Sequence, residues 1–286
     1  MPTVSTGQPT TESSSSNRVV VFADMLGFSA LVEANPIDVR SLRAYSRPLS
    51  LTLDDIIGGS DNRLTATFSS FHHSLRWAIM AAEMRYALTA VTFSDSVFIA
   101  TTHLFEAAAV AVDLAHSLLS QKVPVRMGIA FGSFAALRFH SDVTADGGDH
   151  AAQFLGTAVV RACEAEKCGI KGMRILLHRS VEPLLADSAH NPASPPTGSR
   201  LIRPLECSDA DRAKTSSVRY ELDYWDLAPT KERRAWHALQ DMWASVSDPI
   251  AEHYQATAEA INRMRVARGE APVTSIRRRT LPRCRR

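Results

Sequence analysis

The sequence predicts an α+β fold in which an antiparallel sheet is covered by amphipathic helices. Two β-rich runs, residues 87–93 and 96–102, are separated only by Ser94 and Asp95, which is the signature of a hairpin between antiparallel strands. Other strand-like runs alternate along the chain with helical patterns, and two amphipathic helices follow the last strand. With 286 residues, of which 45% are hydrophobic, the chain has enough apolar material for a substantial core.

The first elements are expected to form a strand, a tight turn and a helix. Residues 1–17 contain nine Ser or Thr and no aromatic residue, which predicts a disordered leader. Residues 19–23 are a short β-branched run, and a helical pattern extends over residues 29–57 with a break near Pro36. A further helix is expected over residues 72–85.

After the hairpin, helices and strands alternate again. Residues 104–121 are Ala-rich and amphipathic and predict a helix. The turn-forming pair Gly132 and Ser133 predicts a second pair of strands, formed by residues 123–131 and 134–139. The remaining elements are expected as a loop at 142–149, a helix at 156–167, strands at 173–178 and 218–225, a short helix at 181–185 and a linker at 188–199.

The last part of the chain changes in pattern and in charge. From residue 230, apolar residues recur at three- and four-residue steps, which predicts two amphipathic helices broken near Pro249. Their apolar stripe has two interpretations, packing on the chain's own body or contact with a second subunit. Residues 261–286 carry nine Arg against the single Glu270, so this end has a charge of +8 and the remainder of the chain −6. A body of that sign is a poor match for nucleic acid, and we expect a solvated basic tail.

The composition also bears on location. The N-terminus has no basic patch followed by an apolar stretch, so no secretory signal is expected. The four cysteines show no pairing pattern and look like reduced thiols, and the longest apolar stretch is too short and too charged to span a membrane. We therefore expect a cytoplasmic protein that is not bound to a membrane.

Two aspartates are the candidates for metal-dependent chemistry. Asp24 stands where the first strand ends, and Asp95 stands at the hairpin tip, so adjacent antiparallel strands can bring both carboxylates together. Mg²⁺ and Mn²⁺ prefer such oxygen ligands, and two ions about 4 Å apart can clamp the attacking and leaving oxygens of a phosphate. A helix N-terminus follows Asp24 and favours phosphate. Its amides belong to Leu26, Gly27, Phe28 and Ser29. Taken singly, Asp24 as a helix cap and Asp95 as a turn residue are the simpler interpretations.

Several segments together resemble the class III nucleotidyl cyclases. Residues 22–29 (FADMLGFS) are similar to that family's opening motif, Phe-x-Asp-x-x-Gly-Phe-Ser/Thr. Residues 93–96 (FSDS) match the position of its second metal aspartate, with Ser94 in place of the usual glycine. Residues 125–132 (VRMGIAFG) are similar to its strand Arg-x-Gly-Ile-x-x-Gly, with Ala130 where histidine is common.

The helix expected at residues 156–166 extends the resemblance, because the family has a helix there that begins Gly-x-x-Val-Asn and ends near a glutamate. The resemblance covers residues 18 to about 225 and implies a ferredoxin-like antiparallel sheet. With the leader, it divides the chain into a cyclase domain at 18–229, a helical extension at 230–267 and a basic tail at 268–286.

The resemblance also assigns roles to particular residues. It implies that Asp24, Met25 and Asp95 hold two divalent metal ions, Mn²⁺ or Mg²⁺. It further implies a homodimer in which one subunit supplies the aspartates and the partner supplies base and ribose contacts. The substrate is then a nucleoside triphosphate, whose 3′-hydroxyl attacks the α-phosphorus while pyrophosphate leaves.

Departures from the family pattern point to the base of the substrate. The base-reading lysine of purine cyclases falls at Val91, and the second base-reading position is Gln153, whose amide offers a donor and an acceptor. Such a pair fits a pyrimidine, and the chain looks most like the pyrimidine cyclases of Pycsar antiphage systems. This implies conversion of UTP to cyclic UMP or, alternatively, of CTP to cyclic CMP; a purine cyclase is a weaker alternative. Tyr45 is a candidate for stacking on the base.

Two further departures leave a non-catalytic alternative open. The family's ribose-holding Asn falls at Val160 and its transition-state Arg at Glu164, which favours a degenerate module that binds nucleotide or merely dimerises. Arg161 lies one helical turn before Glu164 and is the candidate replacement, with a surface ion pair to Glu164 or Glu166 as its other interpretation. Arg126 is a further phosphate candidate, or a residue that supports the sheet.

Overall fold

A computed structural model describes residues 16–35, 63–140, 149–190, 202–206, 216–225, 229–246 and 248–273. Its strands are β1 (Ser16–Met25), β2 (Leu88–Thr92), β3 (Ser96–Thr101), β4 (Val125–His140), β5 (Asp149–Leu155), β6 (Ile175–His178), β7 (Ile202–Pro204) and β8 (Val218–Leu222). Its helices are α1 (Phe28–Ala34), α4 (Arg63–Glu83), α5 (Leu104–Ser120), α6 (Thr157–Glu166), η1 (Arg179–Val181), α7 (Glu182–Leu185), α9 (Pro229–Ala244) and α10 (Asp248–Ala267).

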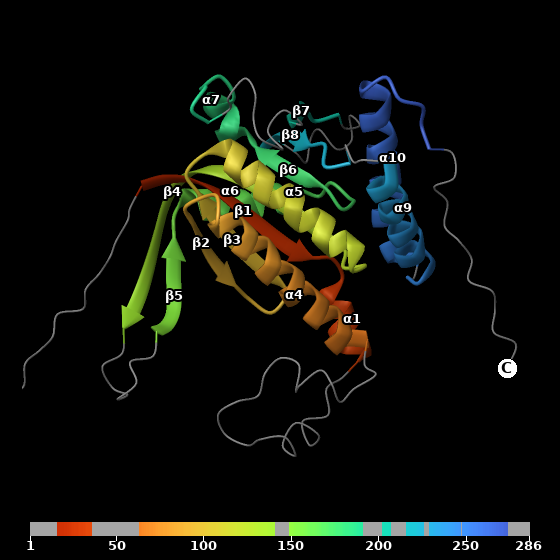
Figure 1. Ribbon diagram of the computed structural model, residues 1–286, viewed down its shortest axis with the longest axis horizontal. Helices are drawn as coiled ribbons and strands as arrows, with labels where there is room; N and C mark the ends of the chain where they lie inside the picture. Colours follow the sequence, from red (N-terminus) through yellow and green to blue (C-terminus); the bar gives the residue numbers. More distant parts are fainter. Residues whose placement is uncertain are drawn as a thin grey trace, which may run out of the picture.

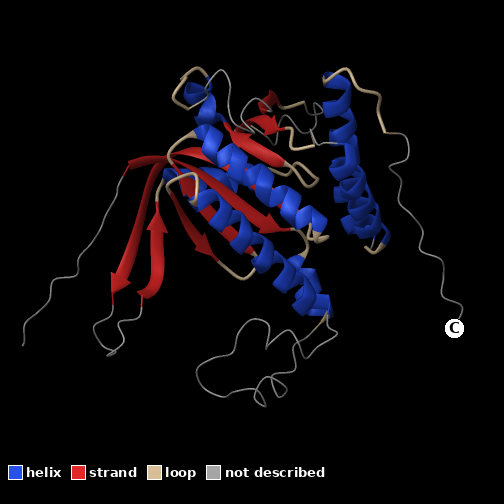
Figure 2. Ribbon diagram, in the orientation of Figure 1, coloured by secondary structure: helices blue, strands red, loops and turns tan. Residues whose placement is uncertain are grey.

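The strands form one sheet, in the order β2-β3-β1-β4-β6-β8-β7, with β5 paired to β4 (Figure 1). The pairings described are antiparallel except that of β4 with β6. The first four strands and their connecting helices have the ferredoxin-like arrangement, which confirms the predicted fold class. Figure 2 shows helices packed against this sheet, with α9 and α10 as a separate pair beyond α5.

The central strand β1 divides its side chains between two cores. Because alternate residues of a strand point to opposite faces, Val21 and Ala23 enter one cluster of buried residues while Val20 and Phe22 enter another. We call these clusters the first core and the second core. All of these side chains are at most 5% exposed, so both faces of β1 are covered.

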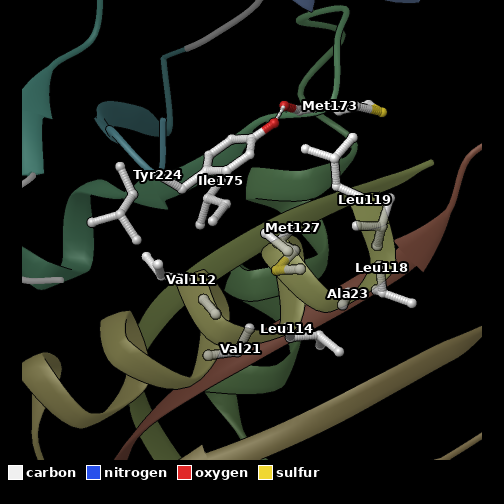
Figure 3. Packing of buried hydrophobic residues seen from close by; sticks show 14 of the residues in the cluster. Val21, Ala23, Val112, Leu114, Leu118, Leu119, Met127, Met173, Ile175 and Tyr224 are labelled. Atoms are coloured by element: carbon white, nitrogen blue, oxygen red, sulfur yellow. Dashed lines mark hydrogen bonds between the residues drawn. The ribbon is translucent and has the colours of Figure 1, made fainter. Parts of the chain in front are cut away.

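The first core is the larger one. Leu114 and Leu118 of α5 pack there against Val21 and Ala23 of β1 and Met127 of β4 (Figure 3). Residues of α4, α9 and α10 join the same cluster. Burial of this much apolar surface, at roughly 25 cal/mol per Å², is the main source of the fold's stability.

Among the residues described, α6 is the helix that covers the second core, and its inner face is made of small residues. Ala158 and Ala162 are fully buried there. Small residues suffice because α6 lies almost against β4. A Cβ added to Gly128 would come within 2.0 Å of the carbonyl oxygen of Ala162, and one added to Gly132 within 2.3 Å of Thr157 Oγ1. These two glycines therefore set the spacing between helix and sheet.

The same contact explains an error in the sequence analysis. Gly132 and Ser133 were predicted to separate two paired strands, but β4 runs through them without a break. Residues 125–131 and 134–139 therefore lie in one strand, whose last part pairs with β5. Gly132 is required where a helix approaches the strand and marks no turn. A glycine in a strand pattern has both meanings, and the local sequence does not separate them.

The C-terminal helices pack on the chain's own body. Trp236 of α9 stacks on Trp225 with ring centroids 4.8 Å apart, and Thr257 Oγ1 of α10 accepts a hydrogen bond from the N–H of Met173 at 2.8 Å. Arg268 forms an ion pair with the fully buried Asp223. Of the two interpretations of the apolar stripe, packing within one chain is the one observed.

Other expectations differ in extent or lie outside the described residues. Helix α4 begins at Arg63, nine residues before its predicted start, and the short edge strand β7 was not predicted. The expected helix beyond residue 35, most of the linker at 188–199 and the tail beyond residue 273 lie outside the described ranges. Among the helices described, none combines the length and the apolarity needed to cross a bilayer.

Candidate active site

The first aspartate lies near the end of the central strand. Asp24 is the penultimate residue of β1 and pairs across the sheet with Ser96 of β3 and Arg126 of β4. Its side chain shares a face with Val20 and Phe22, because they are separated from it by even numbers of residues. Asp24 is therefore a half-buried carboxylate on the second-core side of the sheet, where α6 lies.

The second aspartate is held beside the first by a main-chain hydrogen bond. Asp95 sits in the tip between β2 and β3, and its carbonyl oxygen accepts from the N–H of Met25 at 2.9 Å. Ser94 Oγ donates to Asp95 Oδ1 at 3.2 Å, and a ring nitrogen of His72 lies 3.0 Å from the carbonyl oxygen of Ser94. The hairpin tip that carries Asp95 is thus fastened to the end of β1, which carries Asp24.

The surroundings of Asp24 are short of positive charge. Burial raises the pKa of Asp24 from 3.8 to about 6, and the negative charges of Glu166 and Asp95 add to this rise. Arg126 and Lys167 lower the pKa but do not offset the increase. A cation bound between the aspartates would supply the missing charge.

The carboxylates present fit a hard divalent cation. Mg²⁺ typically uses one or two protein carboxylates, and phosphate and water oxygens complete its shell. Within the described ranges no group of three or more His, Cys, Asp or Glu suited to a metal ion occurs. Met25, the third predicted ligand, buries its side chain in the first core, which leaves only its main chain near the site.

The turn after β1 offers fewer free amides than the sequence analysis expected. The N–H of Leu26 donates to the carbonyl oxygen of Pro124 at 3.0 Å and is not available to a phosphate. Gly27 caps α1 with φ of 76°, a left-handed conformation that side-chain-bearing residues seldom adopt. The amides of Gly27, Phe28 and Ser29 remain in the first turn, where an α-helix has no partner for them.

Helix α6 presents an outward face at the positions where the family pattern has its ribose and phosphate contacts. Val160 is 58% exposed, and the side chain of Glu164 is 54% exposed and lies 3.7 Å from His178. The guanidinium of Arg161 is held by a hydrogen bond from Nη1 to the carbonyl oxygen of Phe131 at 2.9 Å. Arg161 was alternatively interpreted as the ion-pair partner of Glu164 or Glu166. Its guanidinium instead contacts the main chain of β4.

The two predicted base-reading positions each adjoin a residue of one aromatic cluster. Val91 is the cross-strand partner of Phe98, and Gln153 precedes Phe154 on β5. The ring of Phe154 lies 4.8 Å from that of Phe98 and 5.9 Å from that of Phe93, which is 44% exposed. An aromatic cluster thus lies beside Val91, through its cross-strand partner Phe98. Tyr45, the predicted stacking residue, lies outside the described residues.

A buried ion pair next to Asp24 was not among the predicted site residues. Glu166 ends α6 and is fully buried, and Arg126 Nε donates to its Oε1 at 2.6 Å. The guanidinium of Arg126 is therefore occupied, which argues against its role as a phosphate contact. The sequence does contain a signal for this pair, an arginine inside a strand and a glutamate at a helix end, because buried charges need partners. Which charges pair could not be predicted, because the two residues are 40 positions apart.

Comparisons with known proteins give similarity in structure but not in sequence. No family model and no curated protein matches the chain. The guanylyl cyclase Cya2 is 12% identical, with a TM-score of 0.43 over 73% of this chain and 92% of that one. The adenylyl cyclase CyaB from P. aeruginosa is 14% identical, with a TM-score of 0.42 over 74% and 95%. The guanylate cyclase domain of RhGC from Catenaria anguillulae, in complex with GTP, is 15% identical, with a TM-score of 0.43 over 74% and 97%.

Proposed function

We propose that the protein is a nucleotidyl cyclase of the class III type, which converts a nucleoside triphosphate into a 3′,5′-cyclic nucleotide and pyrophosphate. The observation that carries the proposal is the pair of Asp24 and Asp95 at the ends of adjacent strands, fastened by the hydrogen bond from Met25 to Asp95. The motif around residues 22–29 supports it.

The residues of the chain divide the chemical tasks. Asp24 and Asp95 would hold Mg²⁺ or Mn²⁺, and these ions would neutralise the triphosphate and lower the pKa of the substrate hydroxyl. The amides of Gly27 and Phe28 at the start of α1, just after Asp24 in the chain, are the candidates to bind the phosphate chain. Arg161, oriented by Phe131, is the candidate to contact the triphosphate held by the partner subunit.

We further propose that the enzyme is a homodimer with shared sites. The support is the outer face of α6 and the hairpin tip, where Val160 is 58% exposed and Phe93, two residues before Asp95, is 44% exposed. A subunit that covers this surface would bring its own α6 toward the aspartate pair. A shared site then requires both subunits for each reaction.

The proposed substrate is UTP, with CTP as the alternative. Val91 cannot hydrogen-bond a purine, and Gln153 can answer either pyrimidine by rotating its amide. A site that hydrogen-bonds one base edge rejects a mismatched edge, because each unpaired buried polar group costs roughly 1–3 kcal/mol. We expect cyclic UMP to dominate when all four nucleoside triphosphates compete.

The test is to incubate the purified chain with equal concentrations of the four nucleoside triphosphates and Mn²⁺, and to identify products by mass spectrometry. Asp24→Asn, purified in the same way, controls for contaminating cyclases. Cyclic UMP from the wild type alone supports the proposal. Dominant cyclic AMP or cyclic GMP would overturn the base assignment, and cyclic CMP would overturn only the choice of UTP.

A second candidate function, a non-catalytic nucleotide-binding or dimerisation module, is favoured by Val160 and Glu164. An apolar and an acidic residue are exposed where the family places an amide and a guanidinium. This candidate predicts nucleotide binding without any cyclic product, even at high protein concentration. Equilibrium binding of UTP measured in parallel with product formation separates the two candidates.

The cellular role proposed with this activity is the synthesis of a second messenger in antiphage defence. The support is the resemblance of the sequence to pyrimidine cyclases of such systems. We expect cyclic UMP to rise in cells that carry the protein after phage challenge and to stay at background with Asp24→Asn. An unchanged nucleotide level during infection would separate the enzyme activity from this role.

A further inference from the structure

Glu166 is a buried carboxylate that uses only one of its two oxygens. Its side chain has no exposed surface, and both contacts from Arg126, those of Nε at 2.6 Å and of Nη2, are made to Oε1. Oε2 is buried without a hydrogen-bond partner among the residues described. Arginine–carboxylate pairs frequently form two parallel hydrogen bonds, one to each carboxylate oxygen. Here both contacts go to Oε1, so Oε2 is left without a partner in the described part of the chain.

Glu166 lies beside Asp24, because it binds Arg126, the cross-strand neighbour of Asp24. Asp24 and Arg126 are directly opposite each other on β1 and β4, and the absence of a side chain at Gly128 lets the end of α6 descend onto these strands. A Cβ at Gly128 would come within 2.7 Å of the main-chain nitrogen of Glu166. The negative charge of Glu166 acts on Asp24 more strongly than that of Asp95 does.

A buried carboxylate oxygen without a partner costs free energy, so a donor is expected at Oε2 in the working protein. A water molecule without a cation would leave the neighbouring carboxylates of Asp24 and Glu166 without added positive charge. A water molecule bound to a divalent cation offers a strong donor and brings the charge. Such outer-shell acceptors orient metal ligands in many sites.

We propose that Glu166 is a positioning residue for the metal site: its free Oε2 accepts a hydrogen bond from a water ligand of the divalent ion held by Asp24 and Asp95, while Arg126 fixes Oε1. This inference rests on the proposed function for the presence of the metal, but it concerns metal binding and not turnover. It assigns Arg126 the task of orienting Glu166.

The experiment measures Mn²⁺ affinity of the full chain by electron paramagnetic resonance of free Mn²⁺, without nucleotide. Glu166→Gln keeps the size of the side chain and an acceptor for Arg126 but replaces the free oxygen by a donor. We expect its Mn²⁺ dissociation constant to rise by about 10- to 100-fold. Glu83→Gln, which removes an exposed carboxylate on α4, should leave the constant unchanged. Melting without metal shows whether each variant is folded.

The proposal is overturned if a folded Glu166→Gln variant binds Mn²⁺ as tightly as the wild type does. It is also overturned if Asp24→Asn binds Mn²⁺ as tightly as the wild type does. If Glu166→Gln does not fold, a crystal structure of the wild type with Mn²⁺ decides. A metal-bound water about 2.7 Å from Oε2 supports the proposal, and its absence overturns it.

A wild type that makes no cyclic nucleotide but shows these Mn²⁺ effects would refute the proposed function alone. Normal turnover with unchanged Mn²⁺ affinity in Glu166→Gln would refute this inference alone.

Discussion

The two sides of the central sheet differ in what they bury. The first core unites α4, α5, α9 and α10 over one side of β1 and is almost wholly apolar. On the other side, helix α6 covers a smaller cluster, beyond which lie Asp24, Glu166 and partly exposed aromatic rings. The large apolar core and the candidate catalytic residues thus lie on opposite faces of the same strands. Ala23 packs in the first core, and the next residue, Asp24, belongs to the candidate site on the other face.

The largest expected effect removes the chemistry and spares the fold. Asp24→Asn or Asp95→Asn keeps the side-chain shape but takes a hard anionic ligand from the metal site. We expect the rate of cyclic nucleotide formation to fall by more than about 100-fold, above the range of outer-shell changes. Product formation in Mn²⁺ is the measurement, with circular dichroism as the control for folding. A variant that keeps wild-type turnover would remove its aspartate from the site.

The converse change damages the first core. Leu114 is fully buried among residues of β1 and β4, so Leu114→Ala leaves a cavity and should lower the free energy of unfolding by about 2–5 kcal/mol. Leu155→Ala is the matched control, because Leu155 is 60% exposed at the end of β5, and we expect a change within about 0.5 kcal/mol. Chemical denaturation measures both. Equal losses would show that the two faces do not differ in this way.

Mixing two inactive chains tests whether the open side is completed by a partner. Asp24→Asn and Arg161→Ala disable different halves of a shared site, so each heterodimer regains one complete site. Random pairing at equal amounts should restore about one quarter of wild-type activity, and dilution should reduce it. The assay is product formation before and after the chains are mixed. Failure to complement by two folded dimeric chains would contradict a shared site.

The smallest effect concerns the pH dependence of metal-free stability. The pKa of Asp24 is raised in the folded protein to about 6, so protonated Asp24 stabilises the fold fully below about pH 4, and this contribution is lost as the pH rises through 6. Asp24→Asn removes the repelled charge and should melt higher than the wild type at pH 7.5, with the difference vanishing toward pH 4. Solvent screening of a half-exposed group limits the gain to under about 1 kcal/mol, or roughly 3 °C.

Thermal melts of both proteins with a chelator present, at several pH values, measure this difference. Added Mn²⁺ should stabilise the wild type increasingly as the pH rises through 6, because the ion competes with the proton for the carboxylate. A difference between the proteins that grows toward acid pH would have the wrong sign for a raised pKa.

Much of the fold could be predicted from the sequence, because turn residues and periodic apolar positions determine many of its elements locally. The hairpin around Asp95, the helix at residues 104–121 and the two C-terminal helices are encoded by turn residues and periodic apolar positions, and they occur as predicted. The continuity of β4 through Gly132 was not predictable in this way, because the glycine serves a contact with α6, a helix that starts 25 residues later.

The candidate site shows the same division. The proximity of Asp24 and Asp95 could be inferred from their places at the ends of adjacent strands. The engagement of Leu26 by Pro124 and the pair of Arg126 with Glu166 could not, because each joins distant parts of the chain through single atoms. Sequence patterns identify which residue types are available, and tertiary packing decides which of their atoms remain unoccupied.

The stack of Trp225 on Trp236, with ring planes 20° apart, has a practical consequence. The electronic transitions of two indoles this close couple to each other. The pair therefore gives the protein a characteristic signal in near-ultraviolet circular dichroism. One indole follows β8 and the other belongs to α9. The signal therefore reports, without any added dye, whether the C-terminal helices stay docked on the sheet while nucleotide and metal are titrated at its far side.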